Sequence, residues 1–192
     1  MYMTIREFWT VVHGMALGAI FLLAFSGGLA GLWSLRPQWV TAAGAKERMP
    51  RLLVGTVAMA VAAWLTVYVG TYVVYPWYRA PAPKELVAAA QAPTATESDF
   101  HALEPWPRNL LLIPAKKTAI WHQLGMEWKE HVAWITPMLA TAVAFVVVRY
   151  RRQLQYEPAI RRALLLLFVV AFLAAGVAGA FGAFINKVAP IH

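Results

Sequence analysis

Four long apolar stretches without a charged residue constrain this chain more than any other feature of its sequence. They cover residues 8–35, 52–78, 131–148 and 163–185, and none contains Asp, Glu, Lys or Arg. A helix needs about 20 mostly apolar residues to cross a bilayer. Lipid accepts only helices and closed barrels, and the alternating pattern of a barrel strand is absent. The sequence therefore predicts an all-α membrane protein whose residues 1–192 form one domain, a bundle of four transmembrane helices.

The composition excludes an ordinary soluble enzyme. Apolar residues make up 60% of the chain and charged residues only 14%, whereas a soluble domain is about half apolar and a quarter charged. The absence of cysteine excludes disulfides, thiolate metal sites and covalently attached haem. The net charge of +8 reports topology in a membrane protein, so nucleic-acid binding is not expected.

Lys and Arg gather in the two short loops between spans, and this predicts the orientation of the chain. Nine of the 17 basic residues lie there: Arg36, Lys46, Arg48, Arg51, Arg149, Arg151, Arg152, Arg161 and Arg162. Such clusters mark the cytoplasmic side. The longer loop, residues 79–130, carries acidic residues as well and is expected outside. We therefore expect a multi-pass protein of a bacterial inner (cytoplasmic) membrane, with both termini extracytoplasmic.

The 79–130 loop has two parts. The first is rich in Pro and Ala and predicts an extended linker with one short helix. The second, residues 118–130, places apolar side chains at helical spacing opposite polar ones: Ile120, Trp121, Leu124 and Trp128 opposite Gln123, Lys129 and Glu130. Two interpretations are open, an amphipathic interfacial helix on the outer membrane surface or an extension of the third transmembrane helix into water. Pro137 predicts a kink in that third helix.

Two of the five histidines, His13 and His131, lie within or at the mouth of the first and third spans. Both spans run from outside to inside, so the two imidazoles are expected at similar depth. An ionisable side chain in a span indicates a functional site, and imidazole is a natural axial ligand for haem b. Gly14 and Gly18 flank His13 and would let a flat macrocycle approach the backbone. We expect His13 and His131 to hold the haem, with His122 as a competing ligand.

Other interpretations of the same residues stay open. Gly and Ala stripes are more often helix-packing surfaces than cofactor clefts. A histidine near a span end can instead bond a neighbour or face the lipid headgroups. Tyr72, which shares one ridge of its helix with Tyr68 and Tyr75, is a candidate for a quinone pocket or for an aromatic belt. In the predicted topology no histidine lies in the cytoplasmic half of the bundle, so a second haem is not expected there.

The stretches VVHGMALGAI around His13 and EWKEHVAWITP around His131 carry a resemblance at the level of architecture. The chain resembles the membrane-anchor haem b cytochrome subunits of respiratory oxidoreductases. The resemblance implies a non-catalytic subunit that transfers electrons between quinone and a periplasmic redox partner within a larger membrane-protein complex. The chain departs from the two-haem members of that class because it lacks inner-side histidines. The alternative is a cofactor-free membrane anchor or assembly subunit, and a transporter ranks last because the spans hold no charge.

Overall fold

The computed structural model describes residues 3, 5–80, 83–95 and 119–188. This part of the chain is helical and contains no strand. Its elements are α1 Ile5–Val11, η1 Val12–Ala16, α2 Leu17–Ser34, α3 Ala42–Val69, η2 Gly70–Val74, α4 Tyr75–Arg79, α5 Lys84–Gln91, α7 Ala119–Val132, α8 Ile135–Tyr150, η4 Arg151–Gln155 and α9 Pro158–Val188. The turns η1 and η2 are π-helical and η4 is a 3-10 helix.

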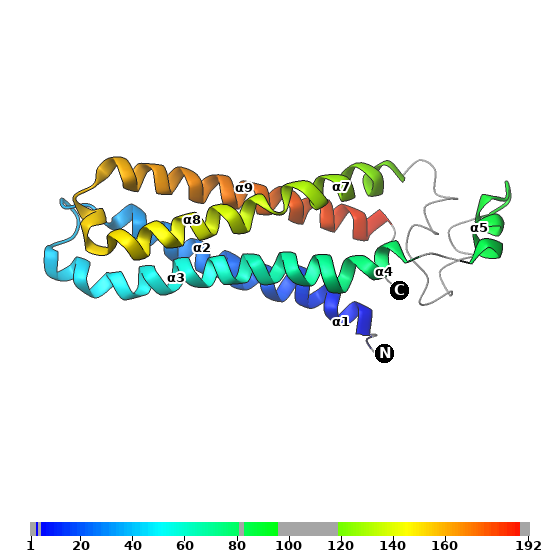
Figure 1. Cartoon of the computed structure of the whole chain (residues 1–192), viewed down its shortest axis with the longest axis horizontal. Coiled ribbons are helices and arrows are strands. Elements are labelled where there is room, and N and C mark those ends of the chain that lie inside the picture. Colours follow the sequence, from blue (N-terminus) through cyan, green and yellow to red (C-terminus); the bar gives the residue numbers. More distant parts are fainter. Residues whose placement is uncertain (1–2, 4, 81–82, 96–118, 189–192) are drawn as a thin grey trace.

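Within these described residues, four helical segments are long and apolar enough to cross a membrane. They are Ile5–Ser34 (span 1), Ala42–Tyr78 (span 2), Gln123–Gln155 (span 3) and Pro158–Ile185 (span 4). The spans run antiparallel in one bundle (Figure 1). Helix α2 packs against α3 and α9, and α8 packs against the same two helices. Spans 1 and 3 therefore lie diagonally across the bundle, and the predicted all-α four-helix membrane protein is confirmed.

The two ends of the bundle differ (Figure 1). One end holds the beginning of α1, helices α4 and α5, and the last turns of α9; we call it the α5 end. The other end holds residues 35–41 and η4, and we call it the short-loop end. Helix α5 is the short helix that the Pro/Ala-rich stretch predicts. That the α5 end faces the periplasm stays a prediction.

Span 2 begins ten residues earlier than its apolar stretch, at Ala42 rather than at Leu52. The Thr41 hydroxyl caps the new start, because its Oγ1 accepts a hydrogen bond from the Gly44 backbone N–H at 3.1 Å. Such a cap satisfies one of the backbone donors that a helix start leaves without a partner. The stretch that hydropathy assigns to a loop is thus mostly helix, and the connection between spans 1 and 2 is short.

Helix α7 leads directly into span 3, as an extension of the third transmembrane helix would. It packs along α9 and bends into α8 at Ala133–Trp134 (Figure 1). Pro137 explains the bend: a proline has no N–H to donate to the carbonyl of Ala133, four residues earlier. The kink predicted from Pro137 is therefore present, just before that residue.

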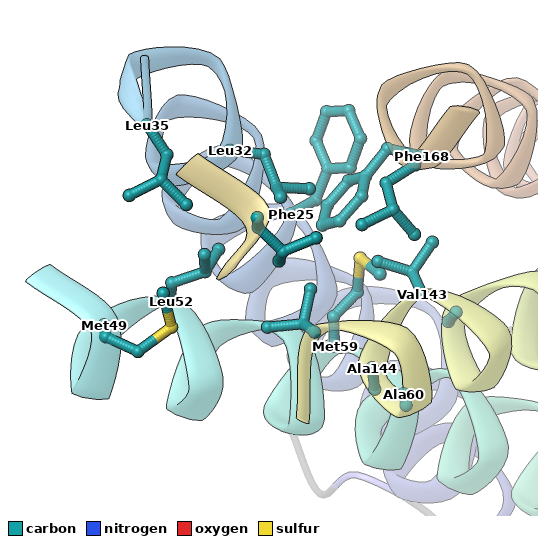
Figure 2. Packing of buried hydrophobic residues seen from close by; sticks show 14 of the residues in the cluster. Phe25, Leu32, Leu35, Met49, Leu52, Met59, Ala60, Val143, Ala144 and Phe168 are labelled. Atoms are coloured by element: carbon teal, nitrogen blue, oxygen red, sulfur yellow. The ribbon is translucent and has the colours of Figure 1, made fainter. Parts of the chain in front are cut away.

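The hydrophobic core cluster lies mainly toward the short-loop end, where aromatic and small residues contact one another across helices. The Phe25 ring of α2 contacts the rings of Phe168 and Phe172 in α9, at centroid distances of 5.5 and 4.5 Å. Figure 2 shows Phe25 and Phe168 among the buried aliphatic side chains. On α3, a Cβ at Gly55 would lie 3.6 Å from the Ala24 carbonyl oxygen of α2. Because lipid tails are as apolar as these side chains, close backbone approach and van der Waals packing hold such helices together.

Hydrogen bonds to backbone carbonyls fasten the short-loop end. Buried Gln155 of η4 donates its Nε2–H to the Val40 carbonyl at 2.6 Å and so ties together the two loops of this end. Arg161 of α9 is also buried and donates from one guanidinium nitrogen to the carbonyls of Leu154 and Gln155, at 2.9 and 3.0 Å. Each bond satisfies a main-chain acceptor that would otherwise be costly to bury.

Candidate functional site

Spans 1 and 2 each contain one π-helical turn toward the α5 end. In η1 the Leu17 N–H donates to the Val12 carbonyl, and in η2 the Tyr75 N–H donates to the Gly70 carbonyl, five residues back in both cases. Helix α1 contacts η2, and η1 contacts α3, so the two turns belong to one helix pair. Turns of this kind are rare and often occur at functional sites. His13 lies in η1, so this helix pair is the candidate functional site.

His13 is held by span 2 rather than by span 3. Its Nδ1 donates a hydrogen bond to the Thr66 carbonyl oxygen at 2.8 Å. The ring lies against Gly70, where a Cβ would stand 2.6 Å from the His13 Cε1 and 3.3 Å from its Nε2. Only glycine leaves room for the imidazole at that position. Because the carbonyl needs a hydrogen from Nδ1, the neutral ring carries its lone pair on Nε2.

The sequence predicts that Lys129 lies on the polar face of an outer helix. The structure instead points it across α9: a Cβ at Gly182 would lie 3.0 Å from the Lys129 Nζ. Lys129 also interacts electrostatically with His13. Its ammonium forms no hydrogen bond or ion pair with the described residues. In the sequence, the only indication of this contact is Gly182, whose missing side chain leaves room for the lysine of α7 beside span 4.

His131 is exposed, and its Nδ1 donates to the Glu127 carbonyl of its own helix at 2.7 Å. Two helical residues correspond to about 200° of rotation, so His131 lies on the opposite side of α7 from Lys129. The two candidate ligands thus have different neighbours, His13 in span 2 and His131 in its own helix. Their joint ligation of one haem stays a prediction. The His122 backbone belongs to α7, and its side chain lies outside the described part.

The remaining candidate residues face outward. A Cβ at Gly14 or Gly18 would meet nothing within 4 Å, so no neighbouring helix closes over the flank of His13 on that side. Tyr72 is 62% exposed and contacts Tyr68 at a ring-centroid distance of 5.0 Å. Tyr72 therefore lies on the outer surface of span 2, while Gly70, two residues away, contacts the His13 ring.

Within the described ranges, no three His, Asp or Glu side chains gather into a metal-ion site. A haem iron needs only one or two protein ligands. For such a ligand, the hydrogen bond made by the other ring nitrogen of the histidine matters more than a cluster of three side chains. His13 and His131 each donate Nδ1–H to a backbone carbonyl. Comparisons of the chain with protein families, curated proteins and solved structures give no match.

Proposed function

We propose that the chain is a membrane electron-transfer subunit that holds one haem b near the α5 end, and that His13 would bind this haem. The observation that supports this proposal is the 2.8 Å hydrogen bond from the His13 Nδ1 to the Thr66 carbonyl. Metal-binding histidines nearly always donate their other ring N–H to a carbonyl or carboxylate, which fixes the tautomer and the orientation of the ring. His13 has this second partner already in place.

The surroundings of His13 fit a flat, anionic cofactor. Gly70 lets the imidazole lie close to the span 2 backbone, and the outer flank at Gly14 and Gly18 is open. Lys129 supplies a positive charge that interacts with the same histidine, and a haem carries two carboxylates that such a charge would bind. When bound, the haem would supply one-electron exchange at the iron.

In this proposal His131 is the second residue that would hold the haem, since its Nδ1 likewise donates to a backbone carbonyl. His131 lies on the exposed side of α7, so binding by both histidines requires α7 to turn about its axis. Binding by His13 alone requires no such turn. Replacing His131 therefore distinguishes a site with one protein ligand from a site with two.

The proposed electron path connects quinone in the bilayer with a periplasmic redox partner. Tyr72 and Tyr68 are exposed on the surface of span 2, where a quinone ring in the bilayer would meet them. In the proposed orientation the basic residues of the short-loop end are cytoplasmic, so the α5 end and the segment between spans 2 and 3 face the periplasm. The host membrane is a bacterial inner membrane, and the chain is one subunit of a larger complex.

Absorption spectra of the purified full chain, oxidised and reduced, test the haem. We expect a Soret band that is lost in His13→Ala and kept in Thr10→Ala, a matched change one turn earlier that removes only a hydrogen bond to the Arg6 carbonyl. His131→Ala should shift the band if two ligands bind and leave it unchanged if one does. A wild-type protein without the band, or an unchanged band in His13→Ala, would eliminate the proposal.

The second candidate function is a cofactor-free anchor or assembly subunit. Five glycines, Gly14, Gly18, Gly27, Gly176 and Gly179, have no atom within 4 Å of their Cβ positions. Exposed small residues along a transmembrane helix are typical of surfaces that pack against helices of other subunits. Under this function the protein would co-purify with larger subunits, and the His13→Ala variant would assemble as well as the wild type.

A further inference from the structure

Two tryptophans hold one arginine at the short-loop end. The guanidinium carbon of Arg36 lies 4.3 Å from the centre of the Trp33 ring and 4.7 Å from that of Trp39. The two indoles are themselves 6.5 Å apart at an interplanar angle of 53°. The loop backbone is fixed at the same point, since the N–H groups of Trp39 and Val40 both donate to the Arg36 carbonyl. We call this unit the Trp33–Arg36–Trp39 clamp.

The clamp orients Arg36 but does not use the N–H donors of its guanidinium group. Cation–π contact uses the ring faces, while a guanidinium carries five N–H donors in a planar fork. Within the described chain, no carboxylate pairs with Arg36 and no acceptor bonds its side chain. Both indoles are about half exposed, at 51% and 54%, so the clamp lies at the surface.

Arg161 adds positive charge near the clamp. Arg161 interacts electrostatically with both Arg36 and Arg162. Arg161 is buried and already occupied by the carbonyls of Leu154 and Gln155. Arg162 is exposed, and its Nε donates to the Pro158 carbonyl at 3.3 Å. No ion pair among the described residues neutralises any of the three arginines, so this region carries a positive charge that an anion would balance.

The position of the clamp indicates which anion that is. Tryptophans at the end of a span lie at the level of the lipid headgroups, and exposed arginines there attract anionic lipid. A guanidinium binds phosphate oxygens through two parallel N–H donors, which a lysine does not do. We propose that the Trp33–Arg36–Trp39 clamp binds the headgroup phosphate of an anionic phospholipid. The site is separate from His13 and does not depend on a haem.

Lipid binding to the full chain in neutral detergent tests the site, with phosphatidylglycerol, phosphatidylcholine and inorganic phosphate as probes. Native mass spectrometry should show phosphatidylglycerol retained by the wild type and about tenfold weaker in Arg36→Gln, as expected for loss of a charge-assisted pair. Arg149→Gln is the matched control, because Arg149 lies over a single ring, that of Tyr150, at 5.9 Å. It should bind lipid like the wild type.

Two further variants separate the clamp from charge alone. Arg36→Lys keeps the charge without the planar fork and should bind at an intermediate level, and Trp33→Leu with Trp39→Leu keeps Arg36 but removes the rings that orient it and should weaken binding. Circular dichroism verifies that each variant is folded. Equal losses in Arg36→Gln and Arg149→Gln, equal retention of phosphatidylcholine, or equally strong displacement by inorganic phosphate would each overturn the proposal.

Discussion

Gly28 of α2 lies directly beneath the ring of Phe168 in α9. A Cβ at Gly28 would stand 2.7 Å from the Phe168 Cζ and 3.2 Å from its Cε1. The ring has no room to withdraw, because Phe168 is fully buried and packs against Phe25 at a centroid distance of 5.5 Å. The contact between these two residues therefore sets how closely spans 1 and 4 approach.

Replacing Gly28 by alanine should destabilise the bundle by about 1–3 kcal/mol, the usual cost of overpacking a close-fitted core. Gly27→Ala is the control: its Cβ would meet nothing within 4 Å, and alanine favours a helix by about 0.5–1 kcal/mol over glycine. Thermal unfolding in detergent measures both. A Gly28→Ala protein as stable as Gly27→Ala would contradict the packing described for α2 and α9.

Gly70→Ala should displace the His13 ring, because the new methyl would lie 2.6 Å from the His13 Cε1. We expect a loss of about 1–3 kcal/mol in unfolding free energy. Removing the ring removes the clash, so the same change made in a His13→Ala background should cost far less. This double-mutant cycle isolates the contact. Equal costs in the two backgrounds would show that the ring and Gly70 do not touch.

Gln155→Ala should loosen the short-loop end. The Val40 carbonyl loses its 2.6 Å hydrogen bond and stays buried, which costs about 1–3 kcal/mol. Gln153→Ala, at an exposed position two residues earlier in the same turn, should change stability by less than about 0.5 kcal/mol. Thermal unfolding of the two variants gives the comparison, and a reversed order would argue against the tie between the two loops.

Arg151→Gly should stabilise the protein. Arg151 has a φ of 47° and a ψ of −124°, a conformation that glycine adopts readily and other residues adopt at a cost of about 1–3 kcal/mol. The gain is reduced by loss of the 3.2 Å bond from Arg151 Nε to the Val148 carbonyl. Arg152→Gly lacks any such relief and should be neutral or destabilising. Melting temperatures that rank the two variants the other way would contradict a strained backbone at Arg151.

Hydropathy predicts the four spans because each crosses lipid, and Pro137 predicts the bend because it lacks a donor. The helical start of span 2 is missed for the opposite reason: residues 42–51 include Lys46, Glu47, Arg48 and Arg51, which hydropathy assigns to a loop. The Thr41 cap and local helix propensity determine that start instead. A cap of this kind is visible in sequence only as one threonine before an alanine-rich segment.

The candidate site is predicted in part. His13 stands out in the sequence because an imidazole in a span is uncommon, but its neighbour does not, since no pattern indicates that Thr66 and Gly70 face it. Lys129 is misplaced because the periodicity of α7 describes one helix alone. Which side of α7 faces the interior depends on α9, and so on Gly182, 53 residues later in the chain.

The two π-helical turns have a consequence for any engineering of this protein. Each inserts one residue into an otherwise regular helix, and one residue corresponds to about 100° around the axis. A helical wheel drawn from α2 therefore assigns the wrong faces to α1. Deleting a single residue from η1 would restore the regular repeat, yet it would swing Ile5–Val11 about 100° away from η2. Such a deletion would make the helix of span 1 regular but would remove the contact between α1 and η2.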